Sequence, residues 1–407
     1  MILPRVAFAT SALFLFVAPF AASGGIRATC LIVAALAIAV SGMWKSLLQP
    51  SAPRATLMLV LAWFLLAPLS IAWTSDLRHT LEELRAESLY GALAFAVFYC
   101  LANDVRRWDR WWIAIFVGTL IALVAKALQT QLGLALWRHP PDGGSGPFST
   151  HLVLVSPLLI ALIAPRPWGF GRRPAVLAAA LALLFAAAWI TREAWTTPNR
   201  IVWPALALVF MVAIAAGRKA AFAPGDSLPA LRRVVVVSAV AMLIAFAASI
   251  AAKNERFYRD DPGFAASVER DLRPRLWVRG SSEWGAAPLL GHGFGREILA
   301  AKFLPETPVG VKHPPIRHGH NALLNIALQL GAVGLLLFIA MLVAFARNYA
   351  ALLTRPNVSI LGVMGLALLA GFVTKNLTDD FFHRHNAQVF WALNGLLTGF
   401  AASARRD

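Results

Sequence analysis

The chain has 407 residues, of which 59% are hydrophobic and only 14% charged, and its mean hydropathy is +0.66. These values exclude a soluble domain of this length and predict an integral membrane protein. The formal net charge is +17 at pH 7, but the basic residues are scattered between apolar runs. Because no polar module gathers this charge, nucleic acid is not an expected partner, and membrane lipids are.

Apolar runs of about 20 residues recur along the whole chain, and each is long enough to cross a bilayer. Backbone polar groups must be satisfied within lipid, so every span is expected to be helical and the fold class is all-α. About twelve transmembrane helices are expected, approximately at 6–22, 27–44, 55–74, 88–104, 111–133, 149–165, 174–190, 200–216, 234–252, 320–345, 359–377 and 386–403.

Two features near the start of the chain need separate interpretation. The first apolar run ends in small residues near Ala21 and also has the form of a secretory signal peptide, although we favour an uncleaved helix. Cys30 and Cys100 both lie inside apolar runs, so no disulfide framework is expected.

The connections between spans differ in charge on the two sides of the membrane. Alternate connections on one side, with both termini, hold 17 basic and four acidic residues, a net charge of +13. The positive-inside rule assigns this side to the cytoplasm. The chain therefore divides into nine helices in 1–252, one large extracytoplasmic loop at 253–319, and three helices in 320–407.

The large loop is too short and too rich in proline to form a domain of its own, so we expect it to fold back onto the mouth of the bundle. Residues 264–285 predict an amphipathic helix broken near Pro274, with Trp277 and Trp284 suited to the membrane interface. The glycines of PLLGHGFG, residues 288–295, indicate a tight turn.

Arginines in and near this loop indicate a phosphate-binding site, because a guanidinium binds phosphate oxygens in pairs and stays charged. Ion pairs or anionic headgroups are the ordinary alternative. Arg200 begins a span, where snorkelling to the interface would also explain it. The basic residues of the loop are Arg270, Arg273, Arg275, Arg279, Arg296, Lys302, Lys312 and Arg317.

His320 is the candidate base. It lies at the expected start of the tenth span, where the helix dipole disfavours an imidazolium and attracts an anion. A neutral ring there can accept a proton, although a helix-capping role is the ordinary alternative, and His318 could substitute for it. Gly331 and Gly334 share a face and would let another helix approach closely. No recognised metal-ligand spacing occurs, so no metal and no cofactor are expected.

Three stretches together resemble the superfamily of O-antigen ligases and polymerases (Wzy-C). They are Arg200 at the head of a mid-chain span, an R-x-R-x-W element at Arg273 leading into PLLGHGFG, and H-N-x9-G-x-x-G from His320 and Asn321 to Gly334. The family signature often continues with Thr-Thr, where this chain has Leu335 and Leu336.

The resemblance implies a GT-C-like, multi-pass glycosyltransferase of the bacterial inner membrane with its site facing the periplasm. Such an enzyme transfers a glycan from undecaprenyl diphosphate to an acceptor; for a ligase the acceptor is lipid A-core, and the reaction is inverting and metal-independent. His320 would deprotonate the acceptor hydroxyl. Arg200, Arg273, Arg275 and Arg279 would bind the diphosphate, with His318, Asn321 and Arg317 as secondary candidates.

Alternatives remain open within and outside this class. An O-antigen polymerase or a protein O-oligosaccharyltransferase would use the same donor with another acceptor. Protein-directed members often carry additional C-terminal soluble segments, whereas this sequence ends soon after its last span, which favours a ligase. A transporter of lipid-linked glycans would also have many spans, but the polar residues here gather at one face.

Overall fold

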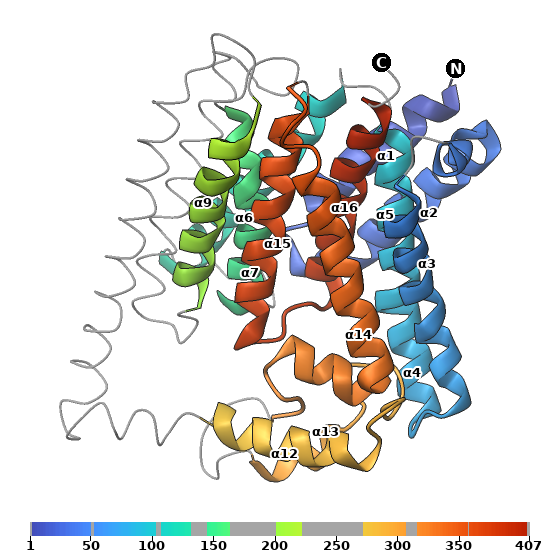
Figure 1. Ribbon diagram of the computed structural model, residues 1–407, viewed down its shortest axis with the longest axis vertical. Coiled ribbons are helices and arrows are strands. Elements are labelled where there is room, and N and C mark those ends of the chain that lie inside the picture. The colour runs from blue at the N-terminus through green and yellow to red at the C-terminus, as the bar shows by residue number, and fades with distance from the viewer. Residues whose placement is uncertain are drawn as a thin grey trace, which may run out of the picture.

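The structure is a computed structural model that describes residues 2–49, 53–102, 107–131, 145–162, 201–221, 272–306, 316–356 and 358–404. Within these ranges the chain is helical and contains no strand (Figure 1). The principal helices are α1 (Ile2–Val17), α2 (Gly24–Ser41), α3 (Arg54–Leu69), α4 (Leu77–Glu83), α5 (Tyr90–Leu101), α6 (Trp108–Gln131), α7 (Ser145–Val155), α9 (Val202–Lys219), α12 (Arg273–Ala286), α13 (Ala300–Phe303), α14 (Ala322–Ala350), α15 (Ser359–Leu377) and α16 (Arg384–Ser403).

Seven helices among the described residues are long and apolar enough to cross a membrane. They confirm a polytopic, all-α membrane protein. The count of twelve stays a prediction, because the expected spans 174–190 and 234–252 lie outside the described residues. The seven are Ala21–Ser41, Arg54–Ala72, Leu77–Leu101, Trp108–Ala125, Val202–Lys219, Ala322–Ala350 and Ser359–Leu377.

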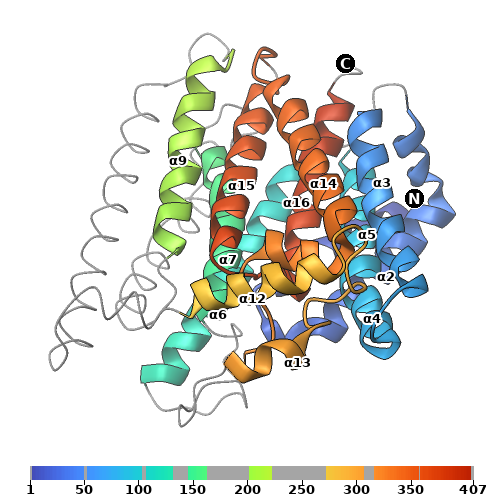
Figure 2. The same ribbon diagram turned by 60° about the horizontal axis from the view of Figure 1, so that its bottom comes forward.

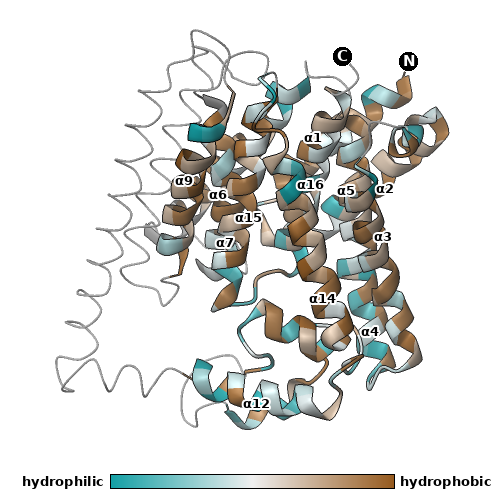
Figure 3. Cartoon of the chain, viewed as in Figure 1, coloured by the Kyte–Doolittle hydropathy of each residue, from teal (hydrophilic) through white to brown (hydrophobic). Residues whose placement is uncertain are grey.

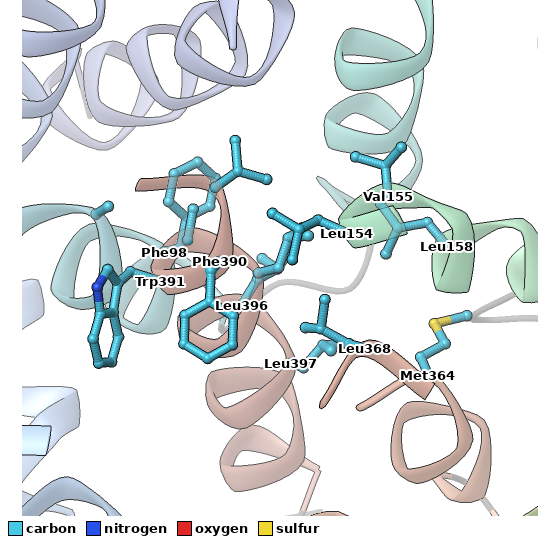
Figure 4. Packing of buried hydrophobic residues seen from close by; sticks show 14 of the residues in the cluster. Phe98, Leu154, Val155, Leu158, Met364, Leu368, Phe390, Trp391, Leu396 and Leu397 are labelled. Atoms are coloured by element: carbon cyan, nitrogen blue, oxygen red, sulfur yellow. The ribbon is translucent and has the colours of Figure 1, made fainter. Parts of the chain in front are cut away.

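Helix α16 lies at the centre of the bundle and is buried from His385 to Ala402. It packs chiefly along α5, while α15 packs against α9 and α14 against α15 and α3. Figure 4 shows Phe390 and Leu397 of α16 among apolar side chains from α5, α7 and α15. This packing fixes both ends of α16, including the connection that precedes it.

One helix begins earlier than the sequence indicated. We expected a loop before residue 88, but the chain is helical from Leu77, through a single π-helical turn at Leu84–Leu89, to Leu101. Asp76 starts the helix by accepting a hydrogen bond from the backbone N–H of His79 at 3.0 Å. Glu83 and Glu87 of this segment are paired within the protein, as described below.

The part of the large loop that the structure describes lies across one end of the bundle. Figures 1 and 2 place α12 and α13 there, whereas α1 begins and α16 ends toward the opposite face in Figure 1. Helix α12 carries more hydrophilic surface than α14 or α15 (Figure 3). A small apolar cluster anchors it, formed by Leu276, Leu299, Phe303 and Leu328.

Helix α14 is interrupted at Gly331, where φ is 64° and ψ is −162°. An uninterrupted helix would join the N–H groups of Ala332 and Val333 to the carbonyls of Leu328 and Gln329. The segment PLLGHGFG replaces both bonds. Pro288 O accepts from Ala332 N at 2.8 Å and Leu289 O accepts from Val333 N at 3.2 Å.

The two carbonyls freed by the same break are satisfied by the same segment. The N–H of His292 donates to Leu328 O and the N–H of Gly293 donates to Gln329 O, each at 2.9 Å. All four backbone groups therefore keep a partner, as they must at membrane depth. The glycine at 331 contacts this loop, and not another helix as we expected, because a Cβ there would lie 2.1 Å from Leu289 O.

Replacing Gly331 with alanine should destabilise the protein by about 2 kcal/mol or more, because its backbone conformation is strained for any other residue and the added Cβ meets backbone atoms. The measurement is thermal unfolding of the purified protein in detergent. Gly217→Ala in α9 is the matched control, since nothing lies within 4 Å of its added Cβ. Equal unfolding temperatures for the two variants would contradict the assigned role of the break.

Candidate functional site

His320 lies at the start of α14, directly before the residue that caps the helix. Asn321 is that cap: its side-chain oxygen accepts from Leu324 N at 3.0 Å, and its amide donates to Leu377 O at 2.7 Å. His320 has a left-handed backbone with φ of 48°, which is uncommon outside glycine. Its side chain is 35% exposed, so the ring can be reached from solvent.

The His320 ring is held by a buried carboxylate. Its Nδ1 lies 3.4 Å from Oδ1 of Asp379, in the connection between α15 and α16. On the other side, Asp379 Oδ2 lies 3.8 Å from Nζ of Lys375, whose side chain has no exposed surface. A proton on Nδ1 shared with the carboxylate leaves Nε2 of His320 with a free lone pair, the arrangement of an oriented general base.

Opposing effects act on the charge of Asp379. Burial raises the pKa of the Asp379 carboxyl, but the hydrogen bond with His320 and the positive charge of Lys375 outweigh it, so that this pKa lies below its usual value. The carboxylate is therefore ionised at neutral pH. It can stabilise a positive charge on His320 after the ring takes up a proton.

Asp380 has a different environment although it is the next residue. Its Oδ2 accepts a hydrogen bond from the amide of Asn325, and its backbone oxygen accepts from Arg296 Nη1 at 2.8 Å. Burial raises the pKa of Asp380, and the charge of Arg296 and the bond from Asn325 offset this only in part. The two adjacent carboxyls thus have pKa values shifted in opposite directions.

His318 supports the turn that carries His320. Its Nδ1 accepts from the backbone N–H of His320 at 3.2 Å, and the centres of the two imidazole rings are 4.3 Å apart. Burial lowers the pKa of His318 well below its usual value, and the charge of Arg296 lowers it further. His318 is therefore a neutral hydrogen-bond acceptor that orients the backbone of His320.

The predicted diphosphate-binding arginines occupy different surroundings. Arg273 begins α12, and its positive charge acts on Lys375. Lys375 in turn pairs with Asp379, the partner of His320, so Arg273 lies near the His320 site. Arg275 is exposed on the same helix, and Arg279 Nη2 pairs with Glu283 at 3.0 Å. Arg317 pairs with Glu297 at 3.3 Å on the surface. Arg200 lies outside the described residues.

The comparison with known families bears on these residues directly. Residues 168–339 match the family model described as O-Antigen ligase. This match confirms the resemblance to the superfamily of O-antigen ligases and polymerases, whose members are glycosyltransferase-like enzymes. The matched range contains Arg200, the R-x-R-x-W element and the whole H-N-x9-G-x-x-G motif. No curated protein matches the chain.

Sequence reasoning did not assign a role to several residues around His320. Asp379 was considered as a possible metal ligand or a partner for arginine, and not as the partner of His320 and Lys375, which it contacts. Lys375 follows an apolar run and has no local motif. A buried lysine four residues before an aspartate is the one signal that could have indicated the pair.

His318 should make the folded state sensitive to acid. Because its pKa is lowered in the folded protein, the unfolded chain takes up a proton near the ordinary value of about 6.5 while the folded protein does not. Stability is thus unaffected above that pH and falls below it, by about 1 kcal/mol at pH 5.5. His318→Asn, which keeps an acceptor, should remove this loss in thermal unfolding measured between pH 7.5 and 5.5. An unchanged pH dependence would refute the assignment.

Proposed function

We propose that the protein is an O-antigen ligase, which transfers O-antigen polysaccharide from undecaprenyl diphosphate to a sugar hydroxyl of lipid A-core. The proposal is carried by one observation: His320, which lies within the range that matches the family, is oriented by the buried carboxylate of Asp379. A base fixed in this way, beside cationic side chains, suits displacement of a phosphate leaving group by a hydroxyl.

The reaction follows from these roles. The acceptor hydroxyl gives its proton to Nε2 of His320, and its oxygen attacks the anomeric carbon of the donor. The new carbon–oxygen bond forms as the bond to the diphosphate breaks, so the configuration inverts and undecaprenyl diphosphate leaves. Asp379 stabilises the imidazolium formed on His320. Nε2 then releases its proton to water, since the ring is partly exposed.

The diphosphate is expected to lie on the cationic side of the site. Arg273 supplies positive charge there, the buried Lys375 acts only through its field, and Arg200 is proposed to join Arg273 from the head of its span. Arginine stabilises phosphate oxygens directly, which makes a metal-independent reaction reasonable. Of the three loop arginines predicted to bind the diphosphate, Arg273 has the strongest support.

The proposed location is the inner membrane with the site facing the periplasm. The loop helices α12 and α13 and the start of α14, which His320 precedes, lie at the end of the bundle opposite the start of α1 and the end of α16 (Figure 1). This arrangement agrees with cytoplasmic termini, which the charge distribution of the sequence predicted.

The first test is transfer in vitro from undecaprenyl diphosphate-linked O-antigen to lipid A-core, with EDTA present. His320→Ala should lower the rate by 10²–10⁴-fold, the usual contribution of a general base. Asp379→Asn should lower it by at least about tenfold, because the tautomer and orientation of His320 are no longer fixed. The thermal unfolding temperature of His320→Ala should stay near that of the wild type. Asp379→Asn removes a counter-charge of the buried Lys375, so its unfolding temperature should fall, and its activity is measured below that temperature.

His318→Asn is the matched control and should retain most activity, because asparagine can still accept a hydrogen bond from His320 N. Loss of activity in this variant, with retention in His320→Ala, would make His318 the base instead. Elongation of the lipid-linked glycan itself, without transfer to lipid A-core, would identify a polymerase.

A second test concerns the arginines. Arg273→Ala should raise the KM for the donor by about tenfold or more, since a charge-assisted hydrogen bond to phosphate contributes about 1.5–3 kcal/mol. Arg279→Ala and Arg275→Ala should change it less, because the first is held by Glu283 and the second is exposed. Arg78→Ala serves as the control, since that side chain is 91% exposed and pairs with Glu82. A larger effect in Arg275→Ala would reverse the assignment.

A further inference from the structure

A second polar cluster lies beside the His320 site and takes no part in the proposed chemistry. It joins Glu83 and Glu87, around the π-helical turn, with His383 and Arg384 at the start of α16. Arg384 Nη2 donates to Glu83 Oε1 at 2.7 Å, and its backbone N–H donates to Glu87 Oε1. His383 Nε2 lies 3.5 Å from both Glu83 Oε2 and Glu87 Oε1.

This cluster forms one wall of a cavity whose other wall belongs to the His320 site. Arg296 and Asp380 line it, as do Gln329 and Ala322 of α14, and Trp63 and Trp391 form its apolar side. The cavity encloses about 40 Å³, which is room for about three water molecules. It therefore admits a few hydroxyl groups, but not a whole sugar ring.

Two buried atoms of residues that line the cavity make no hydrogen bond. One is an acceptor, Oε2 of Glu83, which has His383 Nε2 at 3.5 Å but no bond of normal hydrogen-bond geometry, and the other is a donor, Nε of Arg296. The Glu83 side chain is only 6% exposed and that of Arg296 18%. Buried polar atoms are rarely left unpaired, so these two indicate a ligand that both donates and accepts hydrogen bonds. A hydroxyl group does both.

The local backbone supports a functional role for the same cluster. Arg384 has a left-handed backbone with φ of 49°, and Glu87 lies within the π-helical turn. Strained residues and π-helical turns both gather at functional sites. Glu83, Glu87 and His383 could also hold a metal ion by their spacing, but the guanidinium of Arg384 already binds Glu83 and would repel a cation.

We propose that this cavity is the acceptor subsite, which binds hydroxyl groups on one edge of a sugar ring. Glu83 accepts a hydrogen bond from a sugar hydroxyl, and Arg296 donates one to it. The rest of the ring stays outside the cavity, with the reacting hydroxyl toward His320. This proposal rests on the proposed glycosyl transfer and deepens it by assigning the side from which the acceptor enters.

The test is transfer at varied acceptor concentration with saturating donor. Glu83→Gln should raise the KM for the acceptor by at least tenfold, while the donor KM stays within about twofold. Glu82→Gln is the matched control on the same helix, because its side chain is 58% exposed and points away to Arg78. Ser88→Val, which fills the cavity without changing charge, should also raise the acceptor KM. Unchanged acceptor KM in both cavity variants would overturn the proposal.

Direct binding separates this proposal from the proposed reaction. Core oligosaccharide freed of lipid, titrated calorimetrically into the detergent-solubilised protein without donor, should bind the wild type and bind Glu83→Gln at least tenfold more weakly. Equal binding by both proteins would overturn the subsite. Binding of this kind without any transfer would refute the ligase reaction but support the subsite. Activity that EDTA abolishes and Zn²⁺ restores would make the cluster a metal site instead.

Discussion

The arrangement of the site depends on the break in α14 at Gly331. A helix interrupted at membrane depth exposes four backbone groups, and each would cost several kcal/mol if left unpaired. PLLGHGFG satisfies all four and is thereby fixed against α14 over residues 288–293. This exchange of hydrogen bonds positions Arg296 just beyond the segment, and it redirects the first part of α14, which begins beside His320. The motif therefore needs its glycines for backbone conformation. In turn, the motif positions the candidate catalytic residues.

The charge at the site is organised by two neighbouring carboxyls. Asp379 faces His320 and Lys375, which lower its pKa, whereas burial dominates at Asp380, which faces Asn325, and raises the pKa of that carboxyl. Adjacent titratable groups whose pKa values are driven apart are typical of sites where one group must stay charged. Here the charged one is in contact with the candidate base. Lys375 is buried, so its ion pair with Asp379 helps to explain how that charge is tolerated at the end of a span.

The sequence predicts the helical class, the membrane location and the motif from His320 to Gly334, because hydropathy and short spacings are local properties. It does not predict which residues meet across helices. Asp379 follows His320 by 59 residues, and Arg384 lies 301 residues from Glu83. The expected span began at residue 88, whereas the helix begins at Leu77, and Glu83 and Glu87 are accommodated in it by pairing with His383 and Arg384. Gly331 and Gly334 suggested a contact between two helices, because small residues indicate that another segment packs closely. They do not indicate which segment it is.

Among the described residues, His320 and Arg384 are the two that are not glycine and have positive φ. Such a backbone costs about 1–2 kcal/mol for each residue. In both, the backbone N–H donates to a side chain of the polar clusters, His318 for His320 and Glu87 for Arg384. The connection from Thr378 to His383 links the His320 site to the cavity, because Asp379 contacts His320 while Asp380 and His383 line the cavity. Any displacement of this short segment therefore changes the partner of His320 and the wall of the cavity together, so the base and the cavity cannot be rearranged independently.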